Sequence, residues 1–362
     1  MINLDNLEAI LQYPKSQAVL TSIQNLPRQI VNSWNLSSQF SLPDHYRQVK
    51  SIVICGMGGS RFPILIVKEL FKEEITIPTI ICDDYRLPGF VNQDTLVIGS
   101  SYSGNTEEVI FCLKKAKDKG AKLLGITSGG ELEKIAQSLN FPCLVFSPED
   151  NPSGQPRLGF GYALGSFLGI LKSLELLIPD RPSLDQVISE SHKLTQDFEV
   201  KVPESSNPAK QLAREIFEKV PVYVVSEFLS GLGNAIANQT NETAKSGSQF
   251  RIIPELNHHL MEGLAHPEKN KEVDLFVFFY SALYSPAIQK RFKITRSIVE
   301  KRGFGVLWYE LKQKSKINQA FELLILGSFL TFYLSALYQE DPAAIPFVNY
   351  FKKRLEELKN NS

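Results

Sequence analysis

The sequence has no excess of charge of either sign. Its 362 residues include 39 Lys and Arg and 39 Asp and Glu, so the formal net charge at pH 7 is zero. Proteins that bind nucleic acid or anionic membranes through bulk electrostatics carry a basic surplus. A basic helix-turn-helix segment is also missing from the chain. We therefore expect neither nucleic acid nor a membrane among the partners.

Cysteine is scarce, and its spacing excludes two common uses of this residue. The four cysteines are scattered, without the C-x-x-C spacing of zinc sites, and they indicate no disulfide framework. Three of them, Cys55, Cys82 and Cys112, lie in apolar patterns and are expected to be reduced core residues. No metal site is predicted from them.

The chain also lacks the hydrophobic segments needed for targeting or for spanning a membrane. No basic region followed by an apolar one opens the sequence, so no signal peptide is expected and the predicted location is the cytoplasm. No uninterrupted apolar run reaches membrane-spanning length. The very apolar stretch 320–338 includes Glu322, Ser328 and Ser335, which favours a helix buried in a protein core.

Apolar runs alternate with helical patterns in both halves of the chain, and the length favours two domains. The expected strands are 51–55, 76–82, 95–99, 122–127 and 142–146 in the first half, and 220–226, 274–280 and 306–309 in the second. This order predicts two α/β domains with flavodoxin-like, doubly wound parallel sheets, whose ligands bind at the carboxyl ends of strands.

We expect the chain to divide into four parts. These are a helical N-terminal arm (1–40), a first α/β domain (41–178), a second one (179–340) and a C-terminal helix (341–362). Apolar residues at helical spacing, interrupted by Pro14 and Pro27, indicate the arm.

Two turns in the first half end predicted strands and precede helices. Gly58, Gly59 and Ser60 form the first, but Arg61 breaks the dinucleotide fingerprint G-x-G-x-x-G. Alone, this turn therefore indicates only a tight connection between a strand and a helix.

The second turn, 101–106, is a candidate phosphate site. Hydroxyls of Ser101, Ser103 and Thr106 would join the free backbone N–H groups of the following helix, and Gly104 lets the backbone approach closely. The turn has no Lys or Arg, which favours a phosphate monoester over a nucleotide held by a G-x-x-x-x-G-K loop. Taken alone, the turn is more commonly an ordinary Ser-rich helix cap.

Three further residues are candidates for chemistry. Arg157 lies in a loop fixed by prolines and glycines. Two interpretations of this arginine stay open, a substrate contact and an ordinary surface position. Glu242 and His258 lie close in sequence, without the H-x-x-x-H pattern of a zinc site. The simpler interpretations are a helix-surface ion pair of Glu242 with Lys245 and a loop position for His258.

Together these motifs resemble the bifunctional phosphoglucose/phosphomannose isomerases, two-domain members of the sugar isomerase (SIS) fold family. The resemblance covers nearly the whole chain: G-M-G-G-S at 56–60, S-Y-S-G-N-T-E-E at 101–108, P-R at 156–157, N-E-x-A-K at 241–245, P-E-L-N-H at 254–258, and D-P at 341–342 leading into Phe351-Lys352. The S-Y-S-G-N-T motif is specific for the fold, and the separation of Glu242 from His258 is specific for the isomerase branch.

The resemblance implies an aldose–ketose isomerase that needs no metal or cofactor. It would interconvert glucose 6-phosphate, and also mannose 6-phosphate, with fructose 6-phosphate through a cis-enediol. Glu242 would be the base and His258 would open the sugar ring, while Arg157 would stabilise negative charge on oxygen. Lys352 would reach the site from the C-terminal helix. The substrate phosphate would be held by Gly58, Gly59, Ser60, Ser101, Ser103 and Thr106.

The resemblance also implies a homodimer in which His258 enters the site of the partner subunit. One departure from the family pattern lies beside this histidine. The family usually has N-H-N-E where this chain has Asn257-His258-His259-Leu260. Positioning of His258 or dimer contacts can therefore differ, which affects efficiency and substrate range more than the class of reaction.

Two alternatives remain open at this stage. One is an isomerase of a different sugar phosphate, and the other is a non-catalytic SIS-domain sensor that kept the phosphate site. Glu242, His258 and Lys352 argue against a sensor, because a sensor needs no base. A glutamine-dependent aminosugar synthase is disfavoured, since it needs an N-terminal cysteine nucleophile and residue 2 is Ile.

Overall fold

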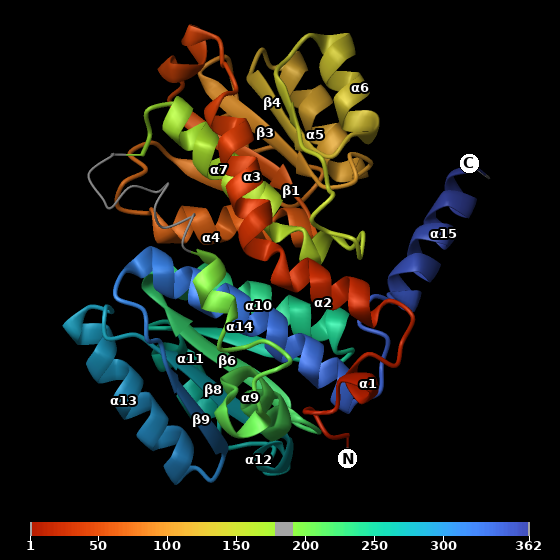
Figure 1. Cartoon of the computed structure of the whole chain (residues 1–362). Coiled ribbons are helices and arrows are strands. Elements are labelled where there is room, and N and C mark those ends of the chain that lie inside the picture. The colour runs from red at the N-terminus through yellow and green to blue at the C-terminus, as the bar shows by residue number, and fades with distance from the viewer. Residues whose placement is uncertain (1, 178–190, 361–362) are drawn as a thin grey trace.

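The computed structural model describes residues 2–177 and 191–360 and contains two α/β domains that pack directly on each other (Figure 1). Each domain is a parallel sheet with helices on both faces, as the alternation of apolar runs predicted. A single hydrophobic cluster continues from one domain into the other. The expected fold class is therefore confirmed.

The first sheet has the strand order β2-β1-β3-β4-β5, and all neighbours are parallel. Its strands are β1 (Ser51–Gly56), β2 (Thr79–Cys82), β3 (Thr95–Ser101), β4 (Lys122–Thr127) and β5 (Cys143–Val145). The central β3 is buried along its whole length, as expected of a strand covered on both faces. β2 starts at Thr79 instead of residue 76, directly after Pro78, which has no N–H to offer a ladder.

Helices cover both faces of this sheet. On one face lie α3 (Leu26–Ser38), α4 (Phe62–Leu70) and α7 (Phe160–Ser173), and on the other lie α5 (Glu107–Asp118) and α6 (Gly130–Leu139). Pro27 stands in the first turn of α3, where its missing N–H costs nothing.

The second sheet, in the order β7-β6-β8-β9, is also fully parallel. Its strands are β6 (Val220–Ser226), β7 (Gln249–Ile253), β8 (Asp274–Tyr280) and β9 (Gly305–Glu310). One face is covered by α9 (Pro208–Ile216), α10 (Ser230–Thr243) and α14 (Lys316–Leu337), and the other by α11 (Leu256–Gly263), α12 (Asn270–Val273) and α13 (Pro286–Lys301). The sequence did not predict β7, an edge strand that is buried only at its last residue.

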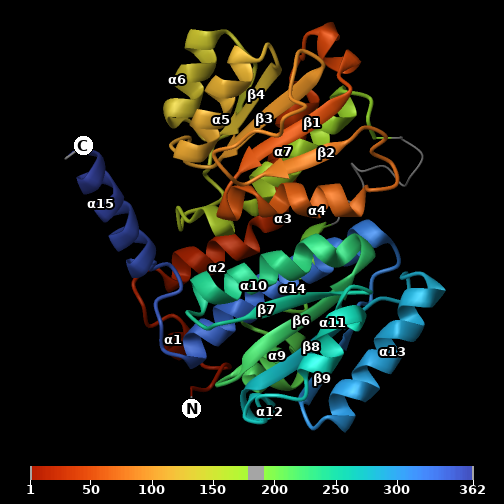
Figure 2. The same cartoon turned by 180° about the vertical axis from the view of Figure 1, so that it is seen from behind.

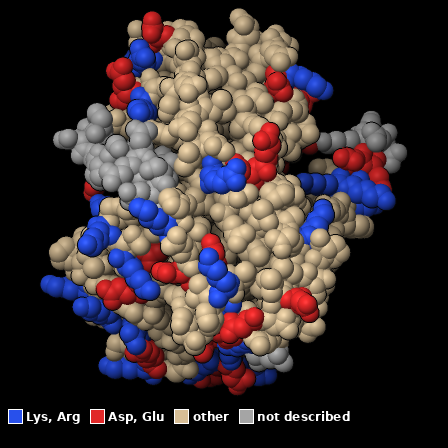
Figure 3. Space-filling view, viewed as in Figure 1, with Lys and Arg blue, Asp and Glu red and all other residues tan. Residues whose placement is uncertain are grey.

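The apolar helix α14 is long enough to cross a membrane, but its most apolar window is entirely buried in the protein. This confirms the expectation of a core helix. On the surface, basic and acidic side chains are interspersed over the face in Figure 3, as the zero formal net charge suggests.

The two ends of the chain lie on the same side of the molecule. The short α1 (Leu7–Ile10) and α2 (Ser16–Gln24) pack on α14, whereas α15 (Pro346–Asn360) projects away from the body (Figure 2). Several large apolar side chains of α15 are exposed: Phe347, Tyr350, Phe351 and Leu358. The division of the chain at residues 40, 178 and 340 stays a proposal.

Glycines allow two pairs of helices to touch backbone to backbone. Between the domains, a Cβ atom on Gly231 of α10 would lie 2.8 Å from the backbone nitrogen of Ile66 in α4. Within the first domain, Gly161, Gly165 and Gly169 of α7 face α3. The four-residue spacing places the three glycines along one side of the helix.

Gly165→Ala should therefore destabilise the protein. The added Cβ would lie 2.2 Å from Ser33 Oγ and 2.4 Å from the Ile30 carbonyl oxygen, so α3 and α7 would have to move apart. Overpacking of this kind costs about 1–3 kcal/mol. Urea denaturation followed by circular dichroism should show a lower midpoint. Gly89→Ala is the matched control, because a Cβ there meets nothing within 4 Å. Equal midpoints for the two variants would contradict the assigned contact.

Candidate active site

A cleft with a volume of about 670 Å³ opens at the carboxyl edge of the first sheet, within the size range of small-molecule sites. Both turns singled out in the sequence line it, together with the loop before α7, the end of α10 and one face of α15. The lining residues of predicted function are Gly58, Gly59, Ser60, Ser103, Thr106, Arg157, Glu242 and Lys352. The structure thus brings together residues that are nearly 300 positions apart in the chain.

The first turn, Gly58–Ser60, is a single 3-10 turn after β1. Gly58 has a φ of +47°, in the region that favours glycine. A Cβ on Gly59 would lie 2.8 Å from the backbone nitrogen of Arg157, so only glycine lets this turn touch the loop that carries the arginine. Ser60 Oγ accepts a hydrogen bond of 2.9 Å from the backbone N–H of Tyr102, which fixes the first turn against the second.

The second turn leads from β3 into α5. Thr106 is the N-cap of α5, but its side chain caps no backbone N–H group, so the first turn of the helix has N–H groups to offer to a ligand. Instead, the Thr106 hydroxyl lies 2.7 Å from that of Ser101. Ser101 is buried beneath the turn and does not line the cleft, whereas Ser103 is exposed at its surface. Ser101 therefore orients Thr106.

Acidic side chains also line the cleft near this helix start. Glu107 and Glu108 occupy the first turn of α5. An anion bound at the turn would therefore have the helix N–H groups and the hydroxyls on one side and two carboxylates close by.

Arg157 is the buried cation of the site, with a side chain only 1% exposed. Its Nη2 donates to the carbonyl oxygens of Pro342 at 2.6 Å and Ala343 at 3.1 Å. Its Nε donates to Thr243 Oγ1 at 3.2 Å, and its Nη1 donates to Gln155 Oε1 at 2.9 Å. Burial lowers the pKa of Arg157, while the negative charge of Glu242 opposes this shift. The guanidinium is thus fixed from several directions.

Glu242 lies near the C-terminal end of α10, and its carboxylate faces Arg157. The Nη1 atom of Arg157 lies 3.5 Å from Glu242 Oε2, and the glutamate side chain is one-third exposed, so it is open to the cleft. This contact replaces the surface pair with Lys245 that was the simpler sequence interpretation. Lys245 instead donates to the carbonyl oxygens of Thr243 and Asp341. Burial, with a contribution from Arg157, lowers the pKa of Lys245 to about 8.

His258 is the one predicted catalytic residue that does not line this cleft. It is exposed on α11, the helix that follows β7 in the second domain. The two residues adjacent to His258 make contacts within the second domain. Asn257 Nδ2 donates to Thr295 Oγ1 at 2.7 Å, and His259 Nε2 lies 3.9 Å from Glu255 Oε1. Within one chain, the structure therefore separates His258 from Glu242.

Sequence reasoning missed several residues of the cleft. These are Tyr85 after β2, Tyr102 in the second turn, Gln155 beside Arg157, and Ile345, Val348 and Leu355 around α15. For Tyr85, the available signal was its position just beyond the carboxyl end of a strand next to β1. Tyr102 and Gln155 stand inside or beside the recognised motifs. The apolar residues of α15 gave no signal, because apolar positions on a helix usually indicate core packing.

Known proteins are similar to this chain in sequence and in fold. Residues 205–355 match the family model described as the bacterial phospho-glucose isomerase C-terminal SIS domain. A hypothetical protein from Thermus thermophilus has a similar solved structure, with a TM-score of 0.72, 15% identity and coverage of 97% of this chain and 92% of that one. At this identity, the similarity supports the fold alone.

Curated relatives match over most of the chain. The bifunctional phosphoglucose/phosphomannose isomerase of Aquifex aeolicus is 32% identical over 85% of this chain and 91% of its own length. The protein with the same name from Caldicellulosiruptor bescii is 30% identical over 94% of this chain and 99% of its own length. With this identity over nearly the full length of both proteins, the chain belongs to the bifunctional phosphoglucose/phosphomannose isomerase family.

Proposed function

We propose that this protein interconverts glucose 6-phosphate and mannose 6-phosphate with fructose 6-phosphate. The observation that carries the proposal is the Glu242 carboxylate facing the buried Arg157 guanidinium in a cleft that also contains a hydroxyl-lined helix N-terminus. A base, a fixed cation and a phosphate site are the parts that aldose–ketose isomerisation needs. A sensor of sugar phosphates would need only the last of them.

The phosphate group would bind at the second turn. Ser103 and Thr106 offer hydroxyls, and the first turn of α5 offers backbone N–H groups. Lys352 lines the same cleft from α15 and supplies a positive charge. Binding energy from the phosphate would hold the reacting carbons in a fixed position, which lowers the entropic part of the barrier.

Glu242 would move the proton between C2 and C1. In this mechanism the carboxylate removes the C2 proton of the open aldose, a cis-enediol forms, and the proton returns to C1. Negative charge develops on the sugar oxygen, and Arg157 would stabilise it. The hydrogen bonds to Pro342, Ala343 and Thr243 hold this cation in place before the charge appears. Mannose 6-phosphate differs at C2, so its use requires rotation about C2–C3 within the cleft.

His258 would open the sugar ring in the active site of a partner subunit. A neutral imidazole can move a proton between the ring oxygen and a hydroxyl near neutral pH. The exposed position of His258 on α11, away from the cleft of its own chain, supports a homodimer with shared sites. The exposed aromatic side chains of α15 offer further surface for a second chain to cover. We also propose a cytoplasmic location, where hexose phosphates are found.

Glu242→Gln should lower kcat for fructose 6-phosphate by about 10³-fold, because the amide cannot accept the C2 proton. Binding of fructose 6-phosphate, measured by calorimetry, should change little, since the phosphate contacts remain. Exchange of solvent deuterium into the sugar should stop as well. Glu300→Gln, on the exposed face of α13, is the matched control. Proton exchange at the wild-type rate in Glu242→Gln would rule out this base.

Mixed dimers test the shared site. His258→Ala and Glu242→Gln should each be nearly inactive alone. After the two proteins are unfolded and refolded together, a mixed dimer has one site with both native residues. Statistical reassortment should then restore about a quarter of wild-type activity. His259→Ala should remain active and serves as the neighbouring control. An inactive mixture would contradict donation of His258 across the interface, provided that mass spectrometry confirms mixed dimers.

Arg157→Lys should lower kcat by about 10²-fold while retaining the charge. A lysine cannot bond simultaneously to Glu242, Thr243 and the two carbonyls of residues 342 and 343. The segment before α15 would lose part of its attachment, so limited proteolysis should cut after residue 343 faster than in the wild type. Arg354→Lys, on the exposed part of α15, is the control for the effect on kcat and should leave kcat unchanged. An unchanged kcat in Arg157→Lys would show that a point charge is sufficient to stabilise the sugar oxygen, and would contradict a need for the fixed guanidinium.

A further inference from the structure

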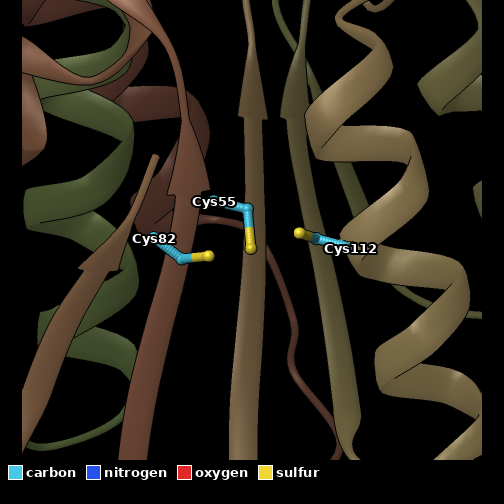
Figure 4. A group of neighbouring side chains, drawn as sticks. All are labelled: Cys55, Cys82 and Cys112. Atoms are coloured by element: carbon cyan, nitrogen blue, oxygen red, sulfur yellow. The ribbon is translucent and has the colours of Figure 1, made fainter. Parts of the chain in front are cut away.

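Three cysteines that are far apart in the sequence lie close together at one face of the first sheet. Cys55 lies on β1, Cys82 ends β2 and Cys112 lies on α5, and their sulfur atoms are all within 4.8 Å of one another (Figure 4). Cys55 and Cys82 are register partners in neighbouring strands, so their side chains share one face. α5 packs on that face and adds the third thiol. All three thiols are buried and free.

The number of ligands in this cluster restricts the ion that it could hold. Among the described residues, no His, Asp, Glu or further Cys joins the three sulfur atoms at this distance. Zn²⁺ is almost always bound by four ligands in structural sites. Three sulfur atoms that each form a bond of about 2.3 Å to a common ion lie roughly 3.8 Å from one another. Since the three sulfur atoms here lie within 4.8 Å of one another, small side-chain rotations would bring them to that separation. The cluster therefore fits an ion that prefers three sulfur ligands.

The charge of the surroundings restricts the ion further. The cluster lies in an apolar layer with Val53, Val97, Val109 and Leu113, where an uncompensated charge is costly. Asp84 adds negative charge beside Cys82. Three thiolates around a divalent ion would leave a net negative charge, whereas three thiolates around a trivalent ion form a neutral complex.

We propose that Cys55, Cys82 and Cys112 form a binding site for a trivalent thiophilic metalloid, with arsenite as its probe. Neutral As(OH)₃ reacts with three thiols to give three As–S bonds and three molecules of water. Each sulfur loses its proton to a departing hydroxide, and no atom is oxidised or reduced. The reaction therefore needs no further reactant.

The site connects to the cleft through the segment after β2. Cys112 Sγ donates to the Asp84 carbonyl oxygen at 3.2 Å, and Cys82 Sγ lies 3.2 Å from the Arg86 carbonyl oxygen and 3.7 Å from that of Asp84. Both S–H donors are lost when As–S bonds form. Asp83 in the same segment pairs with Arg61 at 2.9 Å, and Tyr85 lines the cleft. Occupation of the site should thus weaken sugar-phosphate binding. This last consequence rests on the proposed function, whereas metalloid binding does not.

Native mass spectrometry of the reduced, full-length protein with arsenite tests the site directly. We expect one arsenic atom per chain with the loss of three protons, and a fall in reactive thiols from four to one, leaving Cys143. Cys112→Ala removes one bond and should weaken binding by about 100-fold, since chelation raises the local thiol concentration. Cys143→Ser is the matched control and should bind as the wild type does. Thermal melting of both variants checks that each is folded.

Several results would overturn the proposal. These are no arsenic bound by the folded wild type, equal affinity in a folded Cys112→Ala, or Zn²⁺ bound as tightly as arsenite. If Cys112→Ala does not fold, Cys55→Ala and Cys82→Ala take its place. A rise of at least about threefold in KM for fructose 6-phosphate with arsenite present would support the link to the cleft. Arsenic binding by a protein without isomerase activity would leave this site standing and refute only the proposed function.

Discussion

The hydrogen bonds of the buried Arg157 guanidinium are the interaction on which the arrangement of the cleft depends. A buried charge is tolerated only when it is well paired, and here the partners come from three separate parts of the chain: Gln155, the end of α10, and the carbonyls of residues 342 and 343. The same bonds that satisfy the charge bring Glu242 and the base of α15 to the first domain. This charge is therefore fully paired only when the two domains and the segment before α15 are packed together.

Glycine sets how closely the elements around this charge can approach. Gly59 lets the first turn lie against the backbone of the Arg157 loop, and Gly104, with a φ of +71°, lies against the carbonyl of Gly129. A side chain at Gly59 would push the first turn away from the Arg157 loop, and one at Gly104 would push the second turn away from the turn that follows β4. The hydroxyls of the second turn therefore occupy fixed positions because of residues that carry no functional group.

Most of the fold could be predicted from the sequence, because buried parallel strands consist of continuous runs of apolar residues. Strands such as β3 and β6 could be recognised in this way. The edge strand β7 could not, since Gln249 and Arg251 interrupt its apolar residues and only Ile253 is fully buried. In the same way, the motifs indicated residues that the structure places in the cleft, but they did not predict the contact of Arg157 with Glu242, which joins positions 85 residues apart and depends on how the two domains pack.

The close packing of α4 against α10 has a consequence for how substrate reaches the cleft. Gly231 leaves no space between the two helices, and the hydrophobic core runs through the domain boundary without a break. A hinge that opens one domain away from the other would expose this core. Within one chain, the projecting α15 is attached to the body mainly through the segment before it, so this wall of the cleft can move until a second chain covers it. Exchange of substrate and product would then depend on α15 and on the chain that covers it, in contrast to enzymes in which two domains open and close about a hinge.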